Sequence, residues 1–180
     1  MSLNKLYEKG NTMKNIILIG MPGCGKSTLG VILAKELGFD FIDTDIVIQQ
    51  RTGELLQETL EKKGVVGLLD EEERAILSLD FSRPCVVSTG GSAPLRENSM
   101  RHLKENGICV YIKVSLEEIE RRINNRDTRG IAAEKGETLG DIYSFRTPFY
   151  EKYADITALC EGGNVSENVE KIKNLLLQHN

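Results

Sequence analysis

The feature of this sequence that most restricts its fold is a glycine-rich stretch placed directly after an apolar run. Residues 16–19 lead into Gly20-Met-Pro-Gly-Cys-Gly-Lys-Ser-Thr28, which matches the pattern G-x-x-x-x-G-K-[ST] in full. The glycines let successive backbone N–H groups turn inward as a nest for an anion, and the following helix adds its positive N-terminal end. A plain tight turn is the alternative, but the flanking strand and amphipathic helix favour a phosphate-binding loop. The predicted nucleotide-binding residues of this loop are Gly23, Cys24, Gly25, Lys26, Ser27 and Thr28.

The pattern along the rest of the chain predicts an α/β fold. Short apolar runs alternate with longer amphipathic stretches, and the runs are continuously apolar, which is typical of a parallel sheet covered on both faces. Residues 1–13 are expected to be a polar tail, and 14–180 a single domain. Capping boxes or caps are expected at Ser115, with Glu118, and at Ser166. The predicted strands are 15–20, 39–43, 85–89, 108–114 and 156–159, and the predicted helices are 26–37, 54–63, 68–79, 96–105, 116–125, 139–153 and 167–177.

Composition excludes several classes of protein. The 180 residues carry 23 basic and 27 acidic side chains, interleaved and with a formal charge of −4, so we expect no nucleic-acid partner. No apolar run approaches the roughly 20 residues that cross a bilayer, so we expect no membrane partner. The four cysteines are widely separated, which disfavours zinc and disulfides and fits the cytoplasm. We expect a cytoplasmic monomer that acts on a small molecule.

Two aspartates follow the second apolar run. Asp43 and Asp45 are one residue apart, so their carboxylates project to similar sides if the chain stays extended. Phosphoryl transfer from ATP needs an acidic group near Mg²⁺ and gains from a second that orients or deprotonates the acceptor hydroxyl. We therefore assign Asp43 and the Ser27 hydroxyl to Mg²⁺, Lys26 to the β- and γ-phosphates, and Asp45 to the acceptor. The alternative for Asp45 is that it caps the helical stretch that follows it.

The third apolar run ends in Ser88-Thr-Gly-Gly91. Ser88 and Thr89 are expected to hold magnesium-bound water, and the backbone N–H groups of Gly90 and Gly91 to meet the substrate. A plain turn is the alternative. In parallel sheets ligands bind beyond the carboxyl ends of the strands, so this turn, the phosphate loop and the aspartates should converge on one crevice.

Together these motifs resemble the shikimate kinases, from residue 13 to the C-terminus. The phosphate loop, Phe41-Ile-Asp-Thr-Asp45 and Ser88-Thr-Gly-Gly91 stand in the family's order. The resemblance implies a three-layer α/β/α fold with a five-stranded parallel sheet, a lid near 124–137 and a substrate-binding region near 45–80. It also implies ATP and Mg²⁺ as cofactors, shikimate as the acceptor, and a place in aromatic amino acid biosynthesis.

The same resemblance assigns three arginines. Arg146, in Phe-Arg-Thr-Pro-Phe-Tyr150, matches the family's substrate-binding arginine, Arg129 its catalytic lid arginine, and Arg122 its adenine-stacking arginine. The polar stretch from 124 to 130 suits a lid that swings arginine onto the γ-phosphate and excludes water. The alternative for Arg129 and Arg146 is a role in surface ion pairs.

The sequence departs from the family at positions that contact the acceptor. The family has Phe-Arg-x-x-Glu, whose arginine pairs with the shikimate carboxylate, whereas Leu69 stands at the arginine position within Leu68-Leu-Asp-Glu-Glu72. Arg74 is the nearest candidate substitute, and the acidic run around it is expected to be a solvated helix face. Ser92 replaces the third glycine of the family's turn, and Gln49 replaces a commonly acidic residue.

These departures leave other functions open. One is a kinase of the same fold for another polyol, a sugar acid or a nucleotide. The other is a nucleotide-binding module without transfer activity, against which the presence of Asp43, Asp45, Arg129 and Arg146 counts.

Overall fold

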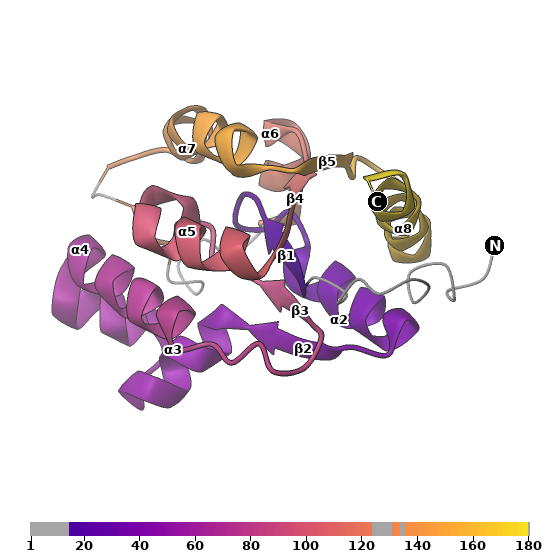
Figure 1. Ribbon diagram of the computed structural model, residues 1–180. Helices are drawn as coiled ribbons and strands as arrows, with labels where there is room; N and C mark the ends of the chain where they lie inside the picture. Colours follow the sequence, from indigo (N-terminus) through magenta and orange to yellow (C-terminus); the bar gives the residue numbers. More distant parts are fainter. Residues whose placement is uncertain (1–14, 124–130, 134–135, 180) are drawn as a thin grey trace.

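A computed structural model, which describes residues 15–123, 131–133 and 136–179, has a five-stranded parallel sheet at its centre (Figure 1). The strand order is β2-β3-β1-β4-β5, with adjacent pairs all parallel. All five predicted strands are present and the predicted fold class is confirmed. The strands are β1 (Asn15–Ile19), β2 (Asp40–Asp43), β3 (Cys85–Ser88), β4 (Gly107–Lys113) and β5 (Ile156–Leu159).

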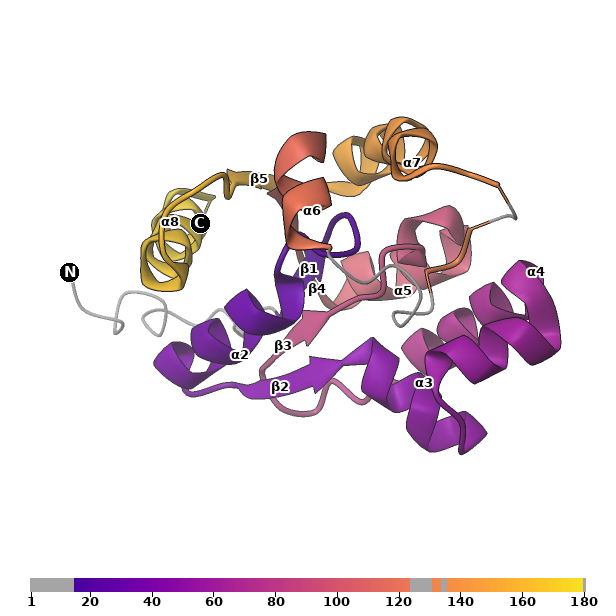
Figure 2. The same ribbon diagram turned by 180° about the vertical axis from the view of Figure 1, so that it is seen from behind.

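Helices cover both faces of this sheet, which explains why its central strands are buried and mostly apolar. α2 and α8 contact each other on one face, and α5 and α7 lie on the other (Figures 1 and 2). All residues of β1 and β3 are buried, whereas the edge strand β5 buries only alternate side chains. The helices are α2 (Lys26–Leu37), α3 (Thr44–Thr52), α4 (Leu56–Leu77), α5 (Glu97–Asn106), α6 (Leu116–Arg122), α7 (Leu139–Tyr153) and α8 (Val165–His179), with a short 3₁₀ turn η1 (Ala93–Leu95).

The region between β2 and β3 differs most from the sequence prediction. α3, which was not assigned as a helix, begins directly after β2, and its cap is Asp43, whose Oδ1 accepts a hydrogen bond of 3.0 Å from the Asp45 backbone N–H. The alternative that Asp45 caps this helix is therefore wrong, because the cap lies two residues earlier and Asp45 is in the first turn. The two helices predicted at 54–63 and 68–79 are one element, α4, broken at Gly64, where φ is 69° and ψ is −178°.

Of the two predicted caps, one has the right position and the other is wrong. Ser115 is the N-cap residue of α6, but its side chain makes no cap hydrogen bond. The predicted capping box is absent, and Glu118 pairs with Arg121 and Arg122. α8 begins at Val165, and its reciprocal cap joins Asn164 and Glu167 rather than using Ser166. The predicted tail, 1–13, lies outside the described residues.

The remaining sequence expectations concern cysteines and membranes. Cys24, Cys85, Cys109 and Cys160 are all buried free thiols, as small apolar side chains would be. Within the described ranges, no helix has the length and apolar character needed to span a bilayer.

Candidate active site

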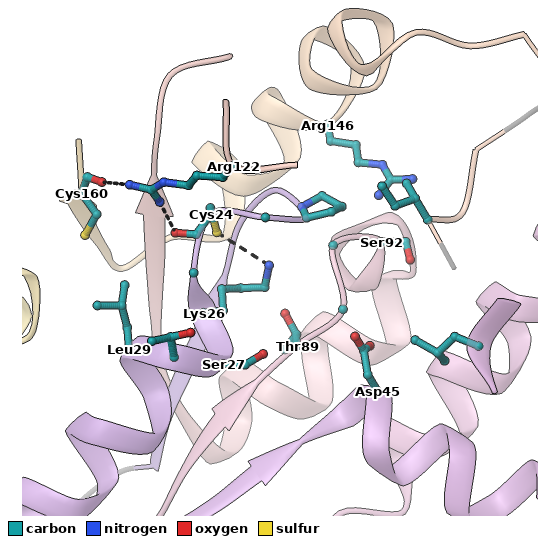
Figure 3. Close-up of a pocket in the computed structure, with 18 of the residues that line it drawn as sticks. Cys24, Lys26, Ser27, Leu29, Asp45, Thr89, Ser92, Arg122, Arg146 and Cys160 are labelled. Atoms are coloured by element: carbon teal, nitrogen blue, oxygen red, sulfur yellow. Dashed lines mark hydrogen bonds between the residues drawn. The ribbon is translucent and has the colours of Figure 1, made fainter. Parts of the chain in front are cut away.

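A cleft of about 770 Å³ lies at the carboxyl ends of the strands, between the phosphate loop and the helices α3 and α4 (Figure 3). Segments that are far apart in the sequence form its walls, because parallel strands bring their carboxyl ends to one edge. The predicted convergence of loop, aspartate and glycine turn is thus present in the structure. The predicted site residues that line the cleft are Gly23, Cys24, Gly25, Lys26, Ser27, Thr28, Asp45, Gly90, Gly91, Arg122 and Arg146.

The phosphate loop owes its shape to residues without a side chain. Gly20, Gly23 and Gly25 have φ values of 146°, 79° and 101°, which other residues rarely adopt. A Cβ on Gly23 would also lie 2.6 Å from Cγ1 of Ile123. Lys26 Nζ is folded over the loop and donates hydrogen bonds to the carbonyl oxygens of Gly20, at 2.8 Å, and Met21, at 2.9 Å. The ammonium group is therefore held where phosphate charge would enter the nest.

Arg122 joins the loop to the opposite wall of the nucleotide end. Its Nη1 donates to the Cys24 carbonyl at 3.0 Å and its Nη2 to the Cys160 carbonyl at 3.3 Å, while Nε pairs with Glu118 at 2.7 Å (Figure 3). The side chain thus lies at the end of the cleft that Gly163 and Asn168 also line. Its position is compatible with an adenine contact.

Oxygen atoms that could bind a metal ion lie next to Lys26, at the ends of β2 and β3. Ser27 Oγ lies 3.2 Å from Ser88 Oγ, and Ser88 is paired in register with Asp43. Mg²⁺ prefers hydroxyl, carboxylate, phosphate and water oxygens, so these three residues fit the ion. Asp43 is not among the residues that line the cleft, because its Oδ1 caps α3; it fits a contact through water better than a direct one.

Asp45 projects from the first turn of α3 into the cleft (Figure 3). Burial raises its pKa to about 6; the Asp43 carboxylate adds to the shift and Lys26 opposes it. A carboxyl group with a pKa near neutral can take a proton from a hydroxyl more readily than an ordinary aspartate. The environment of Asp45 therefore suits the role of a base.

Gly90 lies beside Asp45 at a position where a larger residue would not fit. A Cβ on Gly90 would lie 2.1 Å from Glu72 Oε1 and 3.2 Å from Asp45 Oδ1, so both carboxylates border the same space. The Gly90 N–H is hydrogen-bonded to the Thr44 hydroxyl at 2.9 Å, so this donor is already used within the protein.

Arg146 forms the far wall of the acceptor end. The side chain is buried, and its Nη2 donates to the carbonyl of Ala132, which also lines the cleft. One turn later in α7, the Tyr150 hydroxyl donates to the Gly91 carbonyl at 2.6 Å. α7 is thereby tied to the glycine turn and holds Arg146 over it. The surface ion pair considered for Arg146 is excluded by its burial, and Arg129 lies outside the described residues.

Comparisons with known proteins decide the family. The family model described as shikimate kinase matches residues 22–177. The chain belongs to the shikimate kinase family. It is 36% identical over 166 residues to the shikimate kinase of Haemophilus influenzae, and this match covers 91% of the chain and 92% of that protein.

Solved structures support the same family assignment. A shikimate kinase from Acinetobacter baumannii in complex with shikimate superposes with a TM-score of 0.85 at 32% identity, covering 93% of this chain and 94% of that one. Another relative is human threonine synthase-like 1, which is 37% identical over 169 residues; these are 92% of this chain. The chain spans only 23% of the length of that relative.

Where the family pattern has a second arginine for the acceptor, the described part of this chain has Leu69. Leu69 is half-buried, and Leu68 rather than Leu69 lines the cleft. Arg74 is not a substitute: 58% of its side chain is exposed, and it pairs with Glu71 on the outer side of α4. Among the described residues that line the cleft, the basic side chains are Lys26, Arg121, Arg122 and Arg146.

Glu72 is the functional-site residue that sequence reasoning missed. The acidic run was expected to face solvent, yet Glu72 is only 3% exposed and lines the cleft. Its Oε2 accepts a hydrogen bond of 2.5 Å from the Ser92 hydroxyl, the group that replaces the family's third glycine. Leu68, Glu72 and Ile76 are buried at four-residue spacing, so the helical period was the signal that could have found it.

Proposed function

We propose that this chain is a kinase that transfers the γ-phosphoryl group of ATP to a hydroxyl of a small carboxylated acceptor. One arrangement supports the proposal above all. Lys26 of the phosphate loop, the half-buried Asp45 and the guanidinium of Arg146 face a single cleft, which can hold a nucleotide at one end and a small acid at the other (Figure 3).

In this reaction the acceptor oxygen bonds to the γ-phosphorus while the bond from that phosphorus to the β–γ bridging oxygen breaks. ADP leaves with the electron pair, and the acceptor proton goes to Asp45. Lys26 and the loop N–H groups offset the negative charge of the phosphates. Arg146 holds the acceptor carboxylate, and the N–H of Gly91 contributes to positioning it. We assign Arg129, from the lid, to charge on the transferred group, and Arg122 to the adenine.

Shikimate kinases use ATP with Mg²⁺. In this chain Ser27 would hold the ion and Asp43 would order its water. Bound there, Mg²⁺ would shield the charge on the β- and γ-phosphate oxygens. We assign the substrate-binding region, 45–80, to α3 and α4, and the lid to residues 124–137.

The acceptor indicated by the family is shikimate, with shikimate 3-phosphate as the product. The shikimate complex of the Acinetobacter baumannii relative supports this candidate. A second candidate is a different hydroxylated acid, and the observation that favours it is Leu69. Loss of a charged hydrogen-bond partner costs about 1.5–3 kcal/mol, which is roughly one to two powers of ten in affinity.

The test is a coupled ADP-release assay with Mg-ATP, shikimate and a panel of hydroxy acids, sugars and nucleoside monophosphates. A reaction without acceptor measures background hydrolysis. ADP release that depends on shikimate would support shikimate 3-phosphate as product and a role in aromatic amino acid biosynthesis. Nucleotide binding without transfer to any acceptor would overturn the proposal in favour of a binding module.

A further inference from the structure

The acceptor end of the cleft holds a buried carboxylate oxygen that has no partner. Glu72 is 3% exposed, its Oε2 accepts from Ser92, and its Oε1 has no hydrogen-bond partner in the structure. A buried acceptor atom without a donor is costly, so native proteins rarely leave one unpaired unless it serves a function. Oε1 faces the space above Gly90 that Asp45 also borders. The atom is therefore placed to receive a donor from a molecule in the cleft.

The charges around Glu72 limit what that donor can belong to. The groups that face Glu72 are the Ser92 hydroxyl, Asp45 on α3, Arg146 on α7 and Lys26 on α2. Lys26 belongs to the phosphate loop, so among the described residues that face Glu72 the acceptor meets two carboxylates and one guanidinium. A doubly anionic acceptor would be repelled by Asp45 and Glu72, and an acid with one carboxylate would satisfy only Arg146.

The apolar residues at the acceptor end of the cleft add neither charge nor hydrogen-bond donors. Ile48, Leu56 and Leu68 line the same part of the cleft and contribute no hydrogen-bond donors. At position 69, the family's arginine would be a cation next to Glu72, and here a leucine stands in its place. Among the described residues no cation is hydrogen-bonded to Glu72 Oε1, and the acceptor itself can supply one.

We propose that the acceptor is a zwitterion, a hydroxyl-bearing amino acid whose carboxylate meets Arg146, whose ammonium meets Glu72 Oε1 and whose hydroxyl meets Asp45. An ammonium group offers three donors and a positive charge, which matches the unpaired oxygen and the two carboxylates. This inference rests on the proposed function and specifies its second candidate. Ser92 then acts as a positioning residue that fixes the Glu72 carboxylate.

The first experiment compares matched acceptors on the wild-type protein. Serine, homoserine and 5-hydroxynorvaline, each with its N-acetyl form, are titrated calorimetrically in the presence of Mg-ADP, and turnover is measured with Mg-ATP. N-acetylation removes the positive charge and keeps the hydroxyl and carboxylate. We expect it to weaken binding of the best amino acid roughly ten- to a hundredfold. Equal binding of the two forms would overturn the inference.

The second experiment assigns the effect to Glu72. Glu72→Gln should reduce the affinity for the amino acid by a similar factor and leave that of its N-acetyl form nearly unchanged. Glu73→Gln is the matched control, because it removes the same charge one residue further along α4, outside the residues that line the cleft. Thermal unfolding of both variants checks that they are folded. A Glu72→Gln variant that keeps its preference for the amino acid would contradict the inference.

Binding as a function of pH separates this proposal from its nearest rival. Burial raises the pKa of Glu72 to about 7, so a protonated Glu72 could instead donate to an acceptor carboxylate. An ammonium partner requires the ionised form, so amino-acid binding should strengthen as the pH rises through 7. Weakening over that range would overturn the inference. Turnover of shikimate without turnover of any amino acid would overturn it and leave the proposed function standing, whereas no transfer to any acceptor would overturn both.

Discussion

At the scale of single residues, charge and burial divide the cleft into two ends with different chemistry. Lys26 is held over the phosphate loop by two carbonyl oxygens, while Asp45 lies in an environment that disfavours its ionised form. In the proposed reaction the two groups have separate tasks, which are charge neutralisation for Lys26 and proton transfer for Asp45. Each task can be removed by a single substitution.

Lys26→Ala should reduce turnover by at least about a hundredfold, because the ammonium that offsets developing phosphate charge is lost. The fold should persist, since the glycines determine the loop conformation. Lys35→Ala, an exposed position on the same helix, is the control and should retain wild-type turnover. Steady-state ADP release measures both, and wild-type turnover in Lys26→Ala would contradict the assigned role.

The ionisation of Asp45 should appear in the pH profile of the reaction. If this carboxylate is the base, only its ionised form is active, so kcat/KM should rise with pH through about 6, which is the raised pKa of Asp45. Asp45→Asn should abolish that limb and lower kcat by about a hundred- to ten-thousandfold. A profile that is flat from about pH 5 to 7 would exclude Asp45 as the group that titrates.

At the scale of secondary structure, the helices α3 and α4 of the proposed substrate-binding region depend on two local features. Asp43 is both the last residue of β2 and the N-cap of α3, which places Asp45 in the first helical turn. Gly64 then bends α4 so that its second part presents Leu68 and Glu72 to the cleft. The backbone at these two points controls the distance between the acidic side chains and the phosphate loop.

Gly64→Ala should destabilise the protein by about 1–3 kcal/mol, because the conformation at this position is nearly exclusive to glycine. No atom lies within 4 Å of the added Cβ, so the cost is in the backbone rather than in a clash. Gly140→Ala is the matched control: it lies in α7 with ordinary contacts, and alanine should be neutral or stabilising by about 0.5–1 kcal/mol there. Urea unfolding would show opposite signs for the two, and equal effects would contradict the backbone argument.

At the scale of the whole molecule, the half-buried Asp45 and the buried Glu72 make stability depend on pH. The pKa values of Asp45 and Glu72, about 6 and about 7, are above their unfolded values, so the folded state binds more protons at mildly acidic pH. The stabilising contribution of these two groups to the free energy of unfolding is complete at low pH. It is lost as the pH rises from about 4 to 7. These two groups therefore make the free energy of unfolding lower at neutral pH than at mildly acidic pH.

Glu72→Gln should remove part of this dependence. Relative to wild type, the variant should gain on the order of 2 kcal/mol in free energy of unfolding between about pH 5.5 and pH 8, since it has no proton to lose. Urea denaturation at both pH values measures the difference. A constant offset between the two proteins would mean that Glu72 does not titrate in this range.

The sequence by itself determined the features that depend only on residues close together along the chain. The phosphate loop requires glycines, a lysine and a hydroxyl at fixed spacing, so it could be identified as a continuous motif, as could the five apolar strands and the class of fold. The cleft residues of the loop, Asp45 and the glycine turn could be named because each follows an apolar run, whereas Arg146 was assigned through the resemblance to the shikimate kinases.

Only the tertiary structure decided which side chains of α4 face the cleft. Glu72 lies in a run of four acidic residues that looks like a solvated surface, and the bend at Gly64 together with packing on α5 turns this one inward and Arg74 outward. The bond from Ser92 to Glu72 joins residues 20 positions apart, and the tie from Tyr150 to Gly91 spans 59. Such contacts depend on how helices and strands pack, since no local pattern carries the distance between residues that are far apart in the chain.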